Sequence, residues 1–239
     1  MNTSNATVCE MPSIVREAAI ADGYRLLAML LQFPTDEVVS GLSDGSIALD
    51  IEAIAEEAGM EVSTRTALVE RFTRMTSDPV SSKELFDDIR RERTRLFDHP
   101  DHPVIRLYEG VFLDEERKRA GRASTGARLF INPAALDAER CYRQAGIKRS
   151  SDINIPADCI TTELEFLAHL HRARAEALAD GDERRACEAR GQLEEFGRIH
   201  VAKWFLRFFE RCEQESRHAL YNAVGTLGTA LLDVDGRQR

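Results

Sequence analysis

Two short patterns in the chain look like catalytic motifs, and both lack the context that their chemistry requires. Residues 41–45 have the GxSxG spacing of a serine nucleophile. Such a serine must be held at a sharp turn between a strand and a helix, whereas we expect a simple turn between two helices here. Gly121 and Gly126 have the spacing of a phosphate-binding loop, but Ala127 and Arg128 stand where Lys and Ser or Thr are needed. Neither pattern therefore predicts a catalytic residue.

The possible metal ligands do not form a recognised metal-binding pattern. The densest group lies on a proline-bounded stretch and consists of Asp98, His99, Asp101 and His102. Side chains this close in sequence seldom converge on one ion without distant partners, so we interpret them as polar loop residues. Glu165 and His169, four residues apart, are interpreted as ordinary helix neighbours. The sequence thus predicts no catalytic site, no metal and no cofactor, but it leaves open which distant side chains meet in space.

Helical periodicity runs along almost the whole chain and predicts an all-α fold. Thr35, the Ser81/Glu84 pair and Asn132 are expected to cap helix starts, and Gly146 is expected to follow a helix end. No segment has the pattern of a strand. The predicted architecture is a multi-helix bundle with irregular central loops. Its main helices are expected over residues 14–33, 48–58, 63–77, 82–97, 132–145, 158–179, 181–212 and 215–233.

One domain is expected over residues 13–233, between polar tails at 1–12 and 234–239. We divide it into an N-terminal helical half (13–113), a mobile connection (114–131) and a C-terminal helical half (132–233). The connection is rich in charge and carries glycine. A domain of this size buries enough surface to fold without disulfides or metal.

The net charge of −9, from 32 basic and 41 acidic residues, argues against nucleic acid as a partner. Phosphate backbones are bound by a net basic surface. An acidic chain favours encounter with a cationic partner instead.

The cysteines, the N-terminus and the apolar runs all indicate a cytoplasmic protein. The first basic residue is Arg16 and no apolar run precedes it, so we expect no secretory signal. The longest apolar run, Leu26–Leu31, is far shorter than the roughly 20 residues that span a bilayer, so we expect no stable membrane insertion. Five scattered cysteines without CxxC spacing are expected to be reduced thiols, namely Cys9, Cys141, Cys159, Cys187 and Cys212.

The least regular part of the chain is the segment 96–112, where Pro100 and Pro103 interrupt the helical pattern. A second irregular stretch leads into the helix that begins near Asp158. Taken alone, both segments are helix boundaries anchored by apolar residues.

Together, the two segments resemble motifs of the TorD/DmsD family of redox-enzyme maturation chaperones, to which NarJ-type nitrate reductase chaperones are related. The first motif, LFxGPxxxPxxxYES, is matched by Leu96, Phe97, Pro100, Pro103, Tyr108 and Glu109, with His99 in place of glycine and Gly110 in place of serine. The second, DHIxxELEFL, is matched by Asp158, Ile160, Glu163, Leu164, Glu165, Phe166 and Leu167, with Cys159 in place of histidine. Residues 141–146 resemble the YxxAG segment of the family. Its later helices are matched by Phe196, His200, Trp204 and Phe208, and then by Tyr221 and Leu227.

The resemblance implies a cytoplasmic, non-enzymatic chaperone. Members of the family bind the twin-arginine signal peptide of a molybdoenzyme catalytic subunit and hold the apoprotein until its molybdopterin cofactor is loaded, which prevents premature export. Some members form domain-swapped homodimers, for which 114–126 would be the hinge. By this resemblance the peptide-binding residues are Leu96, Phe97, Pro100, Tyr108, Glu109, Asp158, Glu163, His200 and Trp204.

Within that set we expect an apolar groove flanked by acids. Leu96, Phe97, Tyr108 and Trp204 would line the groove, and the carboxylates of Glu109, Asp158 and Glu163 would meet the arginines. Two residues have simpler readings, since Trp204 fits a core position on an amphipathic helix and Asp158 fits the N-cap of its own helix. Two other functions remain open: a helical regulator that binds a nucleotide or small molecule, and a structural adaptor for a folded redox subunit.

Overall fold

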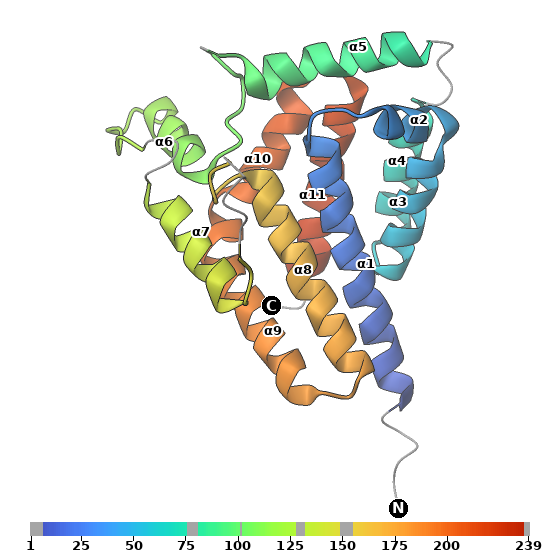
Figure 1. Ribbon diagram of the computed structural model, residues 1–239. Helices are drawn as coiled ribbons and strands as arrows, with labels where there is room; N and C mark the ends of the chain where they lie inside the picture. Colours follow the sequence, from blue (N-terminus) through green and yellow to red (C-terminus); the bar gives the residue numbers. More distant parts are fainter. Residues whose placement is uncertain (1–6, 76–80, 101, 128–131, 149–154, 237–239) are drawn as a thin grey trace, which may run out of the picture.

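Two helices far apart in the sequence, α1 (Thr7–Leu31) and α8 (Ile160–Ala179), lie side by side in the bundle (Figure 1). They run antiparallel, because Arg174 of α8 pairs with Glu17 near the start of α1, whereas Glu165 accepts a hydrogen bond from Gln32 just beyond its end. The apolar face of each helix is buried in the contact, and this pairing forms the middle of the hydrophobic core.

The computed structural model describes residues 7–75, 81–100, 102–127, 132–148 and 155–236, with side chains from residue 14 onward. No strand occurs among these residues, so the predicted all-α class is confirmed. None of the described helices is both long enough and apolar enough to cross a membrane. The remaining helices are α2 (Asp36–Asp44), α3 (Ser46–Glu57), α4 (Val62–Thr73), α5 (Ser82–Arg93), α6 (Glu109–Arg119), α7 (Pro133–Gln144), α9 (Glu183–Phe196), α10 (Ala202–Glu215) and α11 (Ala219–Gly236), with π-helical turns η1 (Thr94–Asp98) and η2 (Gly197–Val201).

The other helices pack around the central pair at its flanks and at one end (Figure 1). Helices α2, α3 and α4 lie on one flank, α6 and α7 on the other, and α5 crosses one end. Helix α9, the turn η2 and α10 follow one another without a break, and α11 packs back against α10. That last contact is very close, because a Cβ at Gly225 would lie 2.6 Å from the carbonyl oxygen of Phe209.

The four helix ends for which the sequence predicts a capping residue are confirmed. Thr35 accepts a hydrogen bond from the Val38 amide, and Ser81 and Glu84 form a capping box. Asn132, which immediately precedes Pro133, accepts a hydrogen bond from the Ala135 amide. Gly146 has φ +78° just past the end of α7. Local capping chemistry is therefore sufficient to define these boundaries.

Four expectations about boundaries require correction. Helix α1 begins at Thr7, inside the expected 1–12 tail, and α11 extends to Gly236, inside the expected C-terminal tail. The expected mobile connection begins with ordered helix, because α6 runs to Arg119. Residues 41–44 belong to α2, where the Ser43 hydroxyl donates to the Val39 carbonyl, so the turn falls at Gly45 alone. The pattern of apolar spacing did not separate these short helices from loops.

A buried ionic cluster fastens the two central helices to α11. His171 of α8 bonds to Glu17 of α1 through Nδ1 at 2.7 Å, and its Nε2 lies 3.5 Å from an oxygen of Asp235. Tyr24 donates to Asp235 as well, at 2.7 Å. Burial disfavours the imidazolium, but the two carboxylates outweigh it and raise the pKa of His171. The charges are thus paired where the three helices meet.

Candidate functional site

The two irregular segments singled out in the sequence pair directly with each other. The Ile160 amide donates to the Leu107 carbonyl at 2.8 Å, and the Glu109 amide donates to the Asp158 carbonyl at 2.9 Å. Between them, Tyr108 and Cys159 form an isolated antiparallel bridge. Each segment therefore satisfies backbone groups of the other that a lone loop would leave unpaired. We call this pairing the loop joint.

Asp158 caps a helix of the opposite segment, not its own. One carboxylate oxygen accepts from the Gly110 amide, in the first turn of α6, at 3.0 Å, whereas the N-cap position of α8 is Cys159. The N-terminus of α6 favours this negative charge. A Cβ at Gly110 would lie 2.5 Å from the side-chain oxygen of Asn132. This crowding accounts for glycine at a position where the TorD/DmsD motif has serine.

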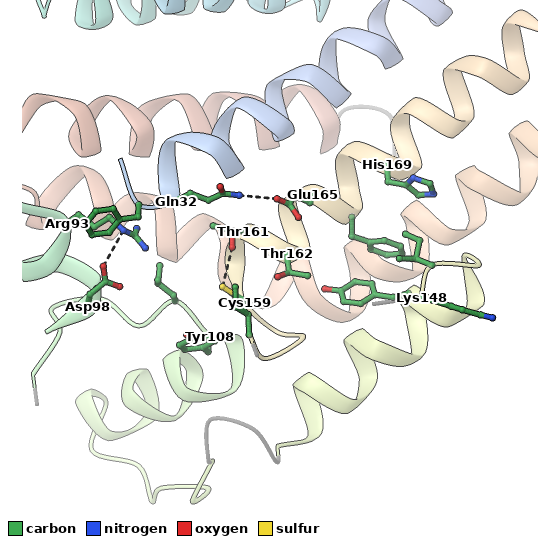
Figure 2. Close-up of a pocket in the computed structure, with 16 residues that line it drawn as sticks. Gln32, Arg93, Asp98, Tyr108, Lys148, Cys159, Thr161, Thr162, Glu165 and His169 are labelled. Carbon is green, nitrogen blue, oxygen red and sulfur yellow. Dashed lines mark hydrogen bonds and ion pairs between the residues drawn. The ribbon is translucent and has the colours of Figure 1, made fainter. Parts of the chain in front are cut away.

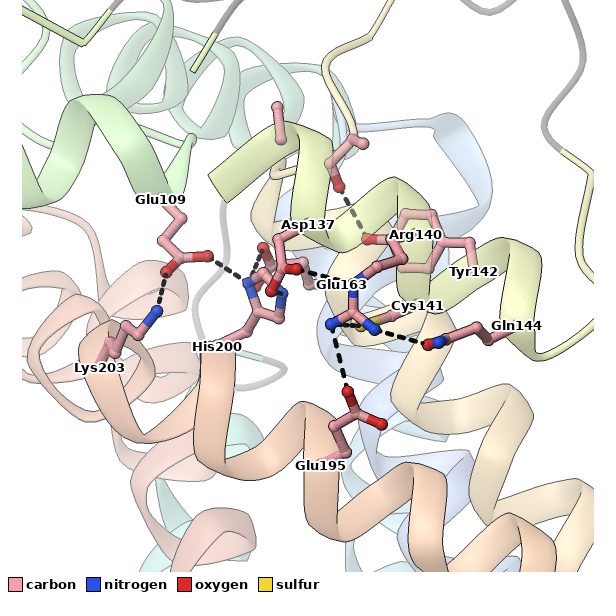
Figure 3. Close-up of polar contacts among 12 residues, drawn as sticks. Glu109, Asp137, Arg140, Cys141, Tyr142, Gln144, Glu163, Glu195, His200 and Lys203 are labelled. Atoms are coloured by element: carbon pink, nitrogen blue, oxygen red, sulfur yellow. Dashed lines mark hydrogen bonds and ion pairs between the residues drawn. The ribbon is translucent and has the colours of Figure 1, made fainter. Parts of the chain in front are cut away.

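A buried polar cluster lies behind the loop joint (Figure 3). His200 bonds to Glu109 through Nδ1 at 2.5 Å, and the Trp204 indole donates to Glu163 at 3.1 Å. Burial and the neighbouring Glu109 raise the pKa of Glu163 well above its ordinary value, which favours the neutral acid. All four side chains of the cluster are buried, namely Glu109, Glu163, His200 and Trp204. The cluster therefore serves to hold α6, α8 and α10 together.

The structure places the nine expected peptide-binding residues in three different environments. Pro100 is exposed on the loop between η1 and α6. Tyr108 is partly buried and lines a cavity. The other seven are buried in the core or in the loop joint, and none of them lines that cavity or the one next to it: Leu96, Phe97, Glu109, Asp158, Glu163, His200 and Trp204. Their acids do not face solvent in this structure, so a groove built from them is not what the fold presents. The interpretation of Trp204 as a core residue agrees with its buried position.

An apolar cavity of about 920 Å³ opens beside the loop joint (Figure 2). Its wall comes from the residues just past α1, from the end of α5 and η1, from the loop joint, from α7 and from the first half of α8. Phe33 and Ile155 are the most exposed of its large apolar side chains, at 51% and 44%. The other apolar and aromatic residues of the wall are Leu107, Tyr108, Tyr142, Ile147 and Phe166. Such a wall suits an apolar ligand segment.

A second cavity, of about 590 Å³, adjoins the first and is acidic. The two cavities share Gln32 and Glu165, whose side chains are hydrogen-bonded at 3.1 Å. Four carboxylates and a single arginine line the second cavity: Asp22, Asp50, Glu57 and Glu165 against Arg25. An apolar surface therefore leads directly into a negatively charged one.

The sequence alone does not indicate these cavities. Phe33 lies at the end of the helix expected over residues 14–33, and the pattern does not reveal that this residue is half exposed. Asp22, Asp50 and Glu57 have the spacing of ordinary surface residues, and only the packing of α1 against α3 brings them to one cavity. Glu165 was noted as part of a motif, but the motif does not say that its carboxylate is exposed.

Two groups of side chains among the described residues have the geometry to hold a metal ion. One consists of Asp137, Cys141 and His200, and the other of Glu109, Glu163 and His200. The loop histidines are not among them, and the His99 Nδ1 accepts a bond from the His102 amide; Asp101 of the same group lies outside the described residues. Cys141, Cys159, Cys187 and Cys212 are all free thiols.

The relatives found by comparison with known proteins have the names of chaperones. TorD from Vibrio cholerae is 30% identical over 128 residues, which cover 52% of this chain and 57% of the relative. TorD from Escherichia coli is 28% identical over 107 residues, 43% of this chain and 48% of the relative. A perchlorate reductase assembly chaperone protein from Dechloromonas aromatica is 26% identical over 178 residues, 74% and 70% of the two chains. The chain spans about half the length of the TorD relatives that it matches.

The family comparison covers more of the chain. The model of the nitrate reductase delta subunit family matches residues 52–210, well over half of the sequence, and includes both segments of the loop joint. The names of the relatives are those of chaperones and not of enzymes. The chain belongs to the nitrate reductase delta subunit family, which confirms the resemblance to the TorD/DmsD maturation chaperones.

Proposed function

We propose that this protein is a cytoplasmic assembly chaperone for the catalytic subunit of a molybdopterin-containing reductase. It binds the twin-arginine signal peptide of the apoprotein, assists insertion of the cofactor and delays export until insertion is complete. The peptide places its apolar segment in the apolar cavity and its arginines in the acidic cavity. The names of the relatives, TorD and the perchlorate reductase assembly chaperone, support this class of client.

The observation that carries the proposal is the contact between the two cavities. A twin-arginine signal peptide has a basic region followed immediately by an apolar region. Because the cavities meet at Gln32 and Glu165, one short extended or helical segment can occupy both in sequence. The order of chemistry along the peptide matches the order of chemistry along the surface.

Charge complementarity supports the same placement. Carboxylates bind guanidinium groups by charge-assisted hydrogen bonds, often with two bonds to one arginine. Asp50 and Glu57 are exposed on α3 and face the second cavity with Glu165 from α8. Asp22 already pairs with Arg172, an example of an arginine bound to a carboxylate of this cavity.

Calorimetric titration tests the proposal with a synthetic signal peptide from a reductase catalytic subunit encoded by the same organism. A peptide with both arginines exchanged for glutamine is expected to bind at least about 10-fold more weakly. Glu165→Lys is expected to weaken the natural peptide by about 10-fold, and most strongly at low salt, because exposed charges are screened.

Glu188→Lys provides the matched control, because Glu188 is an exposed acid on α9 that lines neither cavity. It makes the same change in net charge and is expected to leave the affinity within about 2-fold. Equal affinity for the two peptides, or equal loss in both variants, would refute the assignment of the acidic cavity.

A further inference from the structure

We infer that Asp137, Cys141 and His200 bind one divalent transition-metal ion of the zinc class. This site shares no residue with the two cavities. The proposed peptide binding and the metal site can therefore fail independently.

The three ligand atoms lie close enough together to surround one ion. Asp137 and Cys141 are four residues apart on one face of α7, and His200 faces them from η2 (Figure 3). Their ligand atoms are all within 4.8 Å of one another, and the His200 Nε2 lies 3.5 Å from the Asp137 Oδ2. Two ligands about 2.1 Å from a tetrahedral zinc ion are about 3.4 Å apart. Thiolate, imidazole and carboxylate are the ligands that zinc takes in proteins.

The histidine points independently to a ligand. His200 is fully buried, and its Nε2 has no hydrogen-bond partner among the described residues. Its other nitrogen, Nδ1, bonds to Glu109 at 2.5 Å. With Nδ1 donating to that carboxylate, Nε2 is the nitrogen that can bind an ion, and it lies 3.5 Å from the Asp137 Oδ2. Metal-bound histidines commonly have this same carboxylate partner.

The alternative group, Glu109 with Glu163 and His200, is less suited to an ion. It would use the Nδ1 that already bonds to Glu109, and all three side chains are buried. Asp137, in contrast, is 33% exposed, so an ion can reach the proposed site from solvent. Three protein ligands leave the fourth position for water, as in exchangeable zinc sites.

Arg140 sets the affinity of this site. Its Nε donates to the Asp137 Oδ1 at 2.9 Å, and one terminal nitrogen lies 3.8 Å from the Cys141 sulfur (Figure 3). The first contact occupies the Asp137 Oδ1 and leaves the Asp137 Oδ2 facing His200. The positive charge also opposes a cation, so its removal is expected to strengthen binding.

Cobalt(II) provides a direct optical probe. The full-length protein, free of any affinity tag and with reduced thiols, is titrated with Co²⁺. We expect one equivalent to bind, with a thiolate-to-cobalt charge-transfer band and tetrahedral d–d bands that Zn²⁺ then abolishes. The Cys141 thiol gives its proton to solvent in the process. Failure of the wild-type protein to develop the thiolate band would overturn the inference.

Variants locate the ion. Cys141→Ser is expected to lose the charge-transfer band, and Asp137→Asn to weaken binding at least about 10-fold. Cys187→Ser, which removes an exposed thiol, is expected to leave the spectrum unchanged. Arg140→Gln is expected to bind at least about 3-fold more tightly.

Circular dichroism checks that each variant is folded. If Cys141→Ser does not fold, Asp137→Asn still tests the site, because the Asp137 side chain is partly exposed. An unchanged band in Cys141→Ser, unchanged affinity in Asp137→Asn, or weaker binding in Arg140→Gln would each contradict the site.

Discussion

Replacing Phe33 by aspartate is expected to weaken binding of the twin-arginine signal peptide by about 100-fold while the helix content stays unchanged. The ring of Phe33 is 51% exposed on the wall of the apolar cavity, so the free protein loses little when it is removed. Burial of a phenylalanine side chain by the peptide contributes about 1.5–3 kcal/mol. The introduced carboxylate would also be desolvated against an apolar segment, which adds to the loss. The affinity is measured by calorimetry with the natural peptide.

Two further variants separate the causes. Phe33→Ser removes the ring without adding charge and is expected to cost about 10-fold. Leu206→Asp adds the same charge at a 49% exposed apolar position of α10 that lines neither cavity, and is expected to leave the affinity within about 2-fold. If Phe33→Asp bound the peptide as tightly as Leu206→Asp does, the apolar cavity would not be the binding surface.

Replacing Trp204 by alanine is expected to reduce the free energy of unfolding by about 4 kcal/mol. The indole is fully buried against Phe112 and Phe208, with ring centroids 5.5 and 5.4 Å away. Its removal leaves a cavity in the core, and the Glu163 oxygen that accepts the indole N–H loses a donor. The midpoint of thermal unfolding, followed by circular dichroism, should fall by about 12 °C.

Leu206→Ala is the control on the same helix, because half of that side chain is already exposed. It is expected to change stability by less than about 0.5 kcal/mol. Trp204→Phe keeps most of the ring packing and should lie between the two. A loss of less than about 1 kcal/mol in Trp204→Ala would contradict its core position and return it to the set of groove residues.

The helices could be predicted from the sequence because their determinants are local. Apolar spacing marks α8, and caps such as Asn132 and the Ser81/Glu84 pair mark helix starts. The short helix α6 was missed because its charged sequence has little amphipathic pattern. Its start depends on Asp158, 48 residues away in the sequence, whose carboxylate satisfies the Gly110 amide.

The site could be predicted only in part, because a motif does not reveal whether its residues are buried. Glu109, Glu163 and His200 read as polar residues that could bind a ligand, yet each is buried and bonded to another member of the cluster. Their role is to hold together the two segments of the loop joint, which lies beside the apolar cavity. The exposed groups that suit the peptide, Phe33 and Glu165, become neighbours only through the antiparallel pairing of α1 with α8.

The proposal that one peptide spans both cavities is tested most directly by photo-crosslinking from each cavity in turn. A photoreactive amino acid is placed at Ile155 in the apolar cavity, or at Asp50 in the acidic cavity, and the crosslinked residue of the bound signal peptide is identified by mass spectrometry. We predict that the probe at Ile155 labels the apolar segment of the peptide and that the probe at Asp50 labels residues next to the two arginines. Labelling of the same peptide region from both positions, the reverse order, or no crosslink from either position would contradict it.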